Sequence, residues 1–124
     1  MILHRDITSV VIKCFYEVYN TLGYGFLEKV YENALLIELG NNGLICEKQK
    51  QIKVFYQNKE IGLYYADILV ENKVILELKA AENICEAHEN QLINYLKATE
   101  IEVGLLLNFG KEPQFSRKIF SNDP

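Results

Sequence analysis

The sequence of 124 residues contains little cysteine and little proline. Its three cysteines, Cys14, Cys46 and Cys85, lie far apart, and none belongs to a CxxC or Cys/His cluster. This argues against a structural zinc site and a disulfide framework, and it predicts that the cysteines are small buried side chains. Both prolines fall in the last dozen residues, and there is no low-complexity tract or linker. We therefore expect a single domain over residues 1–124.

Long hydrophobic runs and a positive net charge are also missing. No apolar run reaches the length of a membrane span, and Asp6 interrupts the region where a signal peptide would be apolar. These features predict a cytoplasmic protein without a membrane partner. The formal net charge of −4 lacks the basic footprint that is common in nucleic-acid-binding proteins. Local lysine clusters at residues 48–59 and 111–118 form either solvated faces or basic patches.

The spacing of hydrophobic residues predicts an α+β fold. Apolar residues recur with the period of a helix over residues 5–21, 27–39 and 84–98. In the second of these helices the inner side is formed by Leu27, Val30, Tyr31, Ala34, Leu35 and Leu39. Strands are predicted over residues 45–56, 60–70, 74–80 and 103–109, with an edge strand around residues 118–120. A helical crossover then places the strand at 103–109 beside the first three strands.

Two acids and a lysine interrupt the most apolar part of the predicted sheet. Asp67 lies within ADILV, and Glu77 and Lys79 lie within VILELKA. Because side chains alternate along a strand, Glu77 and Lys79 are expected on one face. Asp67 is expected on the face opposite Ala66 and Ile68.

The loop between these two strands decides whether the two acids meet. A two-residue loop at residues 71–72 pairs Asp67 with Leu76 and places the acids on opposite faces. A three-residue loop at residues 71–73 pairs Asp67 with Glu77, and an asparagine in such a loop tolerates the left-handed conformation. Both registers are compatible with the sequence.

Two carboxylates that face each other favour a bound cation. They repel one another, and burying both without a positive charge is costly. Oxygen ligands of this kind suit Mg²⁺, with Mn²⁺ as a substitute. Lys79 then fits a role in placing or deprotonating an attacking water. The alternative is that Asp67 pairs with Lys79 on a solvated edge and has no chemical function.

Two predicted helices carry further candidate residues. Glu28 lies in a first helical turn, and Tyr31 follows one turn later on nearly the same face. Glu28 is either an acid favoured by the helix dipole or a third carboxylate that points toward the acidic face of the sheet. The simplest interpretation of Tyr31 is a core aromatic residue. His88, Gln91 and Tyr95 form one stripe of a later helix. That stripe is either the boundary of an amphipathic helix or a row of donors for phosphate oxygens.

Several segments together carry a resemblance to a known family. The segment GFLEKVY, residues 25–31, matches the pattern after which the GxxExxY protein family is named. With YYADILVENKVILELKA, HENQLINYL and GLLLNFG, the chain resembles a member nearly from end to end. That family is assigned to the PD-(D/E)XK nuclease superfamily, in the branch with RecB-like nuclease domains. The resemblance implies a restriction-endonuclease-like core, an α/β sandwich of α-β-β-β-α-β order with a mixed central sheet flanked by helices.

The resemblance also implies roles for individual residues. Asp67 and Glu77 correspond to the metal-binding acids, Lys79 to the motif lysine, and Glu28 to the helical glutamate that completes the acidic site. Gln91 and Tyr95 match the Q-x3-Y motif of the RecB-like branch, which helps to place the substrate phosphate. Tyr31 and His88 are further candidates for substrate binding. Ala66 departs from the pattern, since a proline often precedes the motif aspartate.

The sequence therefore predicts a Mg²⁺-dependent nuclease that hydrolyses phosphodiester bonds in nucleic acid, with DNA expected rather than RNA. A homodimer is left open. The alternative is a non-catalytic module of nuclease fold that serves as a binding or regulatory subunit; the acidic net charge and the small size of the chain motivate it.

Overall fold

The computed structural model describes residues 2–121 and has the predicted order of elements. The elements are α1 (Arg5–Leu22), α2 (Glu28–Asn41), β1 (Cys46–Tyr56), β2 (Lys59–Val70), β3 (Val74–Lys79), α3 (Glu86–Lys97), β4 (Val103–Phe109) and β5 (Pro113–Ile119). The α+β class predicted from the sequence is confirmed. Within the described residues, no helix has the length and apolar character needed to span a membrane.

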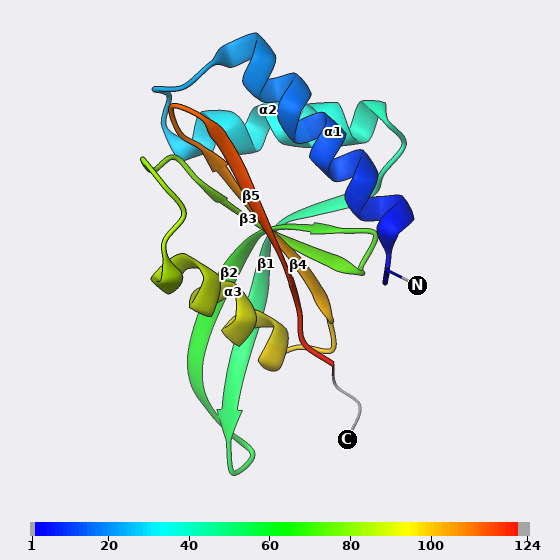
Figure 1. Ribbon diagram of the computed structural model, residues 1–124. Helices are drawn as coiled ribbons and strands as arrows, with labels where there is room; N and C mark the ends of the chain where they lie inside the picture. Colours follow the sequence, from blue (N-terminus) through cyan, green and yellow to red (C-terminus); the bar gives the residue numbers. More distant parts are fainter. Residues whose placement is uncertain (1, 122–124) are drawn as a thin grey trace.

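The strands form one mixed sheet in the order β1-β2-β3-β4-β5, and helices cover both of its faces (Figure 1). Neighbouring strands are antiparallel except β3 and β4, which are parallel. A parallel pair needs a crossover connection, and α3 provides it. Helices α1 and α2 pack on one face of the sheet and α3 packs on the other, so the molecule has three layers.

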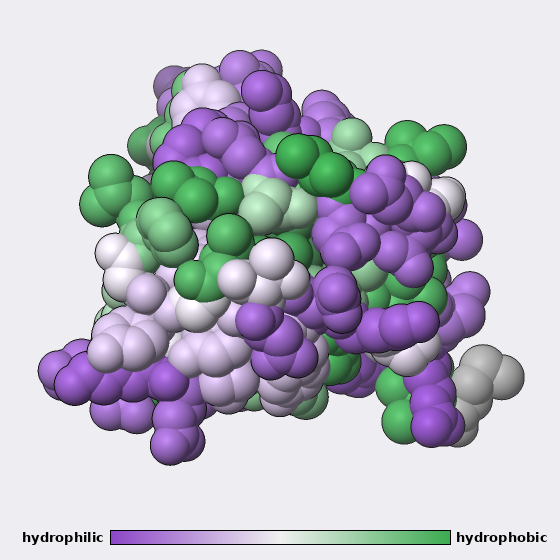
Figure 2. Space-filling view, turned by 90° about the horizontal axis from the view of Figure 1, so that it is seen from above, coloured by the Kyte–Doolittle hydropathy of each residue, from purple (hydrophilic) through white to green (hydrophobic). Residues whose placement is uncertain are grey.

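The main core lies between the sheet and the pair α1 and α2. It includes three rings in contact: Phe109 lies 4.8 Å from Phe15 and 4.3 Å from Tyr31, measured between ring centroids. A smaller cluster lies under α3 and includes Leu92 and Leu106. Every residue of β4 is buried, which explains why its sequence is a continuous apolar run. Seen from the side of α1 and α2, the surface is a mixture of hydrophilic and hydrophobic residues (Figure 2).

Three details differ from the sequence-based expectation. Leu27 and Val30 are exposed, because burial on α2 starts only at Tyr31. Cys85 is also exposed, since it directly precedes the first turn of α3, so it is not a buried side chain. The last strand begins at Pro113 and pairs along all of β4; it is half-exposed at the sheet edge and therefore lacks a hydrophobic signal.

The β1–β2 hairpin is much longer than the strand beside it. β2 has 12 residues and β3 has six, and only residues 68–70 of β2 pair with β3. The outer part of the hairpin therefore leaves the sheet and extends away from α1 and α2, beside α3 (Figure 1). The point where β2 separates from β3 is the position of Asp67.

Candidate active site

The register between β2 and β3 brings the two predicted acids together. Val70 pairs with Val74, which is the register of the three-residue loop. In that loop Glu71 and Asn72 both have positive φ, 52° and 54°. The turn therefore places Asp67 and Glu77 at the same level of the two strands.

Beyond the last backbone pair, the two carboxylates bridge the strands. The Asp67 backbone N–H donates to Glu77 Oε1 at 3.1 Å, and the Leu78 backbone N–H donates to Asp67 Oδ2 at 2.8 Å. Each strand thus gives a backbone donor to the acid of the other strand. Buried backbone donors need partners, so these two bonds compensate for the ladder bonds that are lost where the strands separate.

The alternation of side chains breaks at the same point. Ile68 packs in the core under α1 and α2, whereas Ala66 packs in the cluster under α3. The expectation that Ala66 and Ile68 share a face is therefore wrong. On β1, the residue between the partners of Ala66 and Ile68 is Gln49, whose φ is 53°. This left-handed residue lies across from Asp67, at the level where the faces change.

The two acids lie in an environment that opposes their ionisation. Glu77 is 4% exposed, and burial, followed by the charge of Asp67, raises its pKa to about 8. Burial also raises the pKa of Asp67, although the hydrogen bond from Leu78 N–H acts in the opposite direction. Lys79 favours the ionised form of both acids, but by less than burial opposes it. The pair therefore has too little positive charge around it to hold two carboxylates in their ionised form.

Lys79, Gln91 and Tyr95 complete the side of the site that α3 provides. Lys79 Nζ donates to Gln91 Oε1 at 3.4 Å, which links the end of β3 to α3. The Tyr95 side chain is 6% exposed. Burial, followed by the charges of Glu77 and Asp67, raises the pKa of Tyr95 to about 12, so its hydroxyl remains a proton donor at neutral pH. The structure therefore places Lys79, Gln91 and Tyr95 near Asp67 and Glu77.

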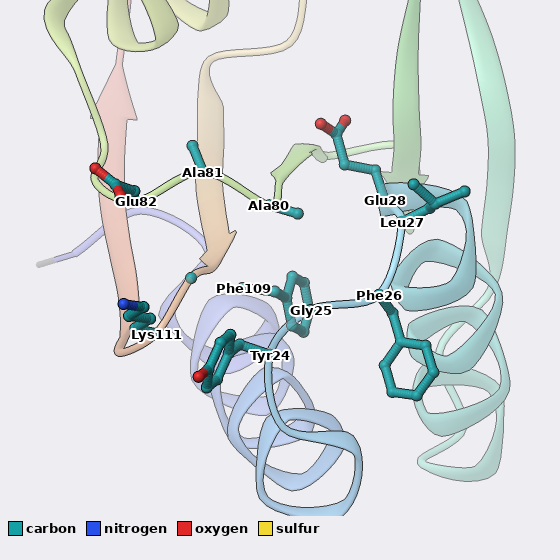
Figure 3. Close-up of a pocket in the computed structure, with 11 residues that line it drawn as sticks. Tyr24, Gly25, Phe26, Leu27, Glu28, Ala80, Ala81, Glu82, Phe109 and Lys111 are labelled. Carbon is teal, nitrogen blue, oxygen red and sulfur yellow. The ribbon is translucent and has the colours of Figure 1, made fainter.

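Glu28 approaches the acids from the other side of the sheet. Its charge raises the pKa of Asp67 and of Glu77, so it lies within electrostatic range of both. It also lines a cavity of about 410 Å³, with Glu82 and Lys111 on the opposite side (Figure 3). Neither Asp67 nor Glu77 lines this cavity, so it adjoins the acid pair without containing it.

The sequence reading did not identify Glu32, the other acid near Asp67. Its side chain is 5% exposed, and it accepts hydrogen bonds from Lys29 Nζ and Gln49 Nε2, both at 2.8 Å. The charge of Glu32 acts on Asp67 more strongly than the charge of Glu28 does. Its position four residues after Glu28, on the same side of a helix, is the signal that could have revealed it.

A second missed residue, Asn108, fixes the chain that follows Lys79. Asn108 is fully buried in β4, accepts a bond from Ala81 N and donates one to Ala81 O, both at 2.9 Å. A buried amide with both ends satisfied holds its partner in one position. The signal in the sequence was a single polar residue within the apolar run VGLLLNF.

Two residues predicted to bind substrate make structural contacts in the fold. Tyr31 has no exposed surface, and its hydroxyl donates to Gly23 O at 2.6 Å and accepts a bond from Phe26 N at 3.3 Å. It fixes the loop before α2 and is not available to a substrate. His88 Nδ1 accepts a bond from Cys85 N at 3.5 Å, so its ring caps the start of α3. A substrate contact of His88 remains a prediction.

The donor set suits a hard divalent cation. Asp67 and Glu77 offer carboxylate oxygens in a partly enclosed position where a positive charge is lacking. Within residues 2–121, however, no group of three acidic, histidine or cysteine side chains is arranged to hold an ion. The site thus presents two candidate ligands, and the charge of Glu28 acts on both of them.

Comparisons with known proteins agree with this fold. The sequence model of the PD-(D/E)XK nuclease superfamily matches residues 5–119. Among solved structures, the crystal structure of SSO0001 superposes on this chain with a TM-score of 0.57 at 19% sequence identity. The alignment covers 95% of this chain and 60% of that protein, and at this identity the likeness concerns the fold alone. No curated protein matches the sequence.

The role of Tyr31 in the core predicts the effect of removing its hydroxyl. Tyr31→Phe should lower the free energy of unfolding by about 1 kcal/mol, because the removed hydroxyl bonds two backbone groups of the preceding loop. Urea unfolding followed by circular dichroism measures this change. Unchanged stability together with weakened binding of nucleic acid would instead assign Tyr31 to the substrate.

The raised pKa of Glu77 predicts how the stability of the metal-free protein depends on pH. Between its ordinary value of 4.5 and about 8, the folded state keeps a proton that the unfolded chain has released. The free energy of unfolding should therefore fall as the pH rises through this window. Glu77→Gln stays neutral and removes this contribution.

The measurement is urea unfolding of both proteins in EDTA at several pH values within this window. The free energy of unfolding of the wild type should fall relative to that of Glu77→Gln as the pH rises. Taking the difference between the two proteins removes the contributions of titrating groups that they share. A difference that is constant across the window would contradict the assignment.

Proposed function

This chain belongs to the PD-(D/E)XK nuclease superfamily, and on that premise we propose that it is a metal-dependent nuclease that hydrolyses phosphodiester bonds in DNA. The observation that carries the proposal is the exchange of backbone donors and carboxylates between β2 and β3. This exchange brings two acids together where burial and mutual repulsion disfavour their charge. Such an arrangement is costly unless a cation neutralises it.

The residues around the acid pair fit distinct roles. Asp67 and Glu77 would hold Mg²⁺, or Mn²⁺ as a substitute, with Glu28 as a direct or water-mediated ligand. When bound, the ion would polarise the scissile phosphate and lower the pKa of a water. Lys79 orients the attacking water or stabilises the developing negative charge. Gln91, which accepts a hydrogen bond from Lys79, and Tyr95 bind phosphate oxygens.

Finer assignments also belong to this proposal. The GFLEKVY segment supports membership of the GxxExxY family, and the Q-x3-Y spacing of Gln91 and Tyr95 supports the RecB-like branch. A cytoplasmic location and a homodimer remain expectations. The second candidate is a non-catalytic module of nuclease fold. It is favoured by one observation, namely that the part of the chain described, residues 2–121, contains no ready group of three ligands.

The direct test is cleavage of labelled single-stranded and duplex DNA and RNA with Mg²⁺, Mn²⁺ or EDTA. Asp67→Asn and Glu77→Gln preserve the shape of each side chain and remove its charge. Each should lower the cleavage rate by at least about 100-fold, since metal catalysis supplies several kcal/mol. Glu82→Gln is the matched control, because Glu82 is an exposed acid that lines the neighbouring cavity.

Three outcomes would contradict the nuclease proposal. Cleavage that persists in EDTA, or that both variants retain, would exclude the acid pair as the catalytic centre. If the wild type cleaves none of the four polymers, the non-catalytic module becomes the better account.

The role of Gln91 separates substrate placement from metal binding. Gln91→Ala should lower the cleavage rate by about 10-fold or more, because Lys79 loses its partner and the phosphate loses a contact. The affinity for Mn²⁺, measured by calorimetry, should not change. Asn20→Ala, an exposed amide on α1, is the control. Parallel loss of cleavage and Mn²⁺ affinity in Gln91→Ala would assign this residue to the metal site instead.

A further inference from the structure

An open groove of about 920 Å³ runs between α3 and the outer part of the β1–β2 hairpin. The hairpin forms one wall with residues 53–55, 61, 62 and 64, and the exposed side of α3 forms the other. In Figure 1 the hairpin passes beside α3 after leaving the sheet. The groove exists because β2 separates from β3 at Asp67, so the same structural feature creates both the acid pair and the groove.

The charge of the groove differs from the charge of the whole chain. Lys53 and Lys97 line it, and among the described residues no aspartate or glutamate does. Lys53 Nζ lies 3.9 Å from Glu60 Oε1, in an ion pair that is half-exposed and therefore weak. The chain as a whole has 17 acids and a net charge of −4. A surface of this size without acids is thus suited to a polyanion.

The groove also presents aromatic rings to solvent. Tyr64 is 49% exposed and Phe55 is 58% exposed, and both line the hairpin wall. Behind Tyr64 lies Tyr95, with a distance of 5.7 Å between ring centroids. The ring of Tyr95 is buried and supports the exposed ring of Tyr64 from behind. Exposed rings among lysines are typical of surfaces on which the bases of a single strand stack.

The groove is continuous with the candidate active site. Gln91 lines the groove and also accepts the hydrogen bond from Lys79. Tyr95 likewise lines the groove and lies within the electrostatic range of Glu77 and Asp67. A strand bound along the groove would therefore bring its phosphates to the acid pair at one end.

We propose that this groove binds an unpaired stretch of DNA next to the scissile phosphate, with bases stacked on Tyr64 and Phe55 and phosphates near Lys53 and Lys97. The bases of a duplex have their faces covered by neighbouring pairs, so stacking on side chains favours a single strand. The inference rests on the proposed nuclease function and adds a substrate class to it: DNA that is single-stranded at or beside the cut.

The test measures binding without cleavage. Fluorescence anisotropy is recorded in EDTA for a labelled single strand of about 20 nucleotides, for its duplex and for the matching RNA. The single-stranded DNA should bind at least about 10-fold more tightly than the duplex. Tyr64→Leu keeps an apolar side chain but removes the ring, and it should weaken binding by about 5- to 150-fold, the range of one lost base stack. Tyr56→Leu is the control, because Tyr56 is 63% exposed on the same hairpin outside the groove.

The lysines predict the dependence on salt. Lys97→Gln should reduce the slope of log affinity against log salt concentration by about 0.7, the value for one phosphate contact of a single strand. Lys13→Gln, on α1 across the sheet, should leave the slope unchanged.

Several outcomes would overturn the proposal. The proposal is wrong if the wild type binds duplex and single-stranded DNA with equal affinity, or if it binds RNA more tightly than DNA. It is also wrong if Tyr64→Leu and Tyr56→Leu change the affinity for single-stranded DNA equally. Self-association in ultracentrifugation that Tyr64→Leu abolishes would show that the groove is a dimer interface instead. Failure of the nuclease proposal would give a different result: the wild type would bind single-stranded DNA in the groove but would not cleave it. If Tyr64→Leu changes neither cleavage nor binding, the groove proposal is wrong and the nuclease proposal stands.

Discussion

The separation of β2 from β3 at Asp67 is the constraint on which the rest of the structure depends. A sheet that splits leaves backbone donors without partners, and here two carboxylates accept them. This satisfies the backbone but buries two acids beside each other. Burial raises the pKa of both, the charge of Asp67 raises the pKa of Glu77 further, and the pair lacks positive charge. The same separation frees the long hairpin to form a wall beside α3. The acid pair and the groove that carry the two proposals thus originate from one local feature.

The surrounding elements hold this feature in place. Beyond the end of β3, Asn108 of β4 fixes Ala81 and so the chain that follows Lys79. On the other side of the acid pair, Glu32 binds Gln49, whose left-handed backbone lies beside Asp67. A non-glycine residue with positive φ inside a strand is strained, and such strain persists only where neighbouring contacts enforce it. These contacts indicate a site that is held rigid before any ligand binds.

The sequence predicted the elements, because periodicity and patterning describe regular structure well. The two acids were identified because they violate the apolar pattern of their strands, as functional residues often do. The loop register was left open by the sequence and was decided by the backbone at Glu71 and Asn72. The reversal of faces at Gln49 could not be predicted, since no residue type there signals positive φ. Glu32 was missed because an acid in a helix is usually solvated, and Tyr31 was misassigned because its motif does not reveal its burial.

The most direct test of this account is the binding of Mn²⁺, measured by calorimetry or electron paramagnetic resonance on the wild type, Asp67→Asn and Glu77→Gln. The account predicts that the wild type binds Mn²⁺ and that each single variant loses most of the affinity, because the two carboxylates act as one site. It also predicts that the double variant is little worse than either single variant. Mn²⁺ affinity that is the same in all four proteins would contradict the claim that these two acids hold a metal ion.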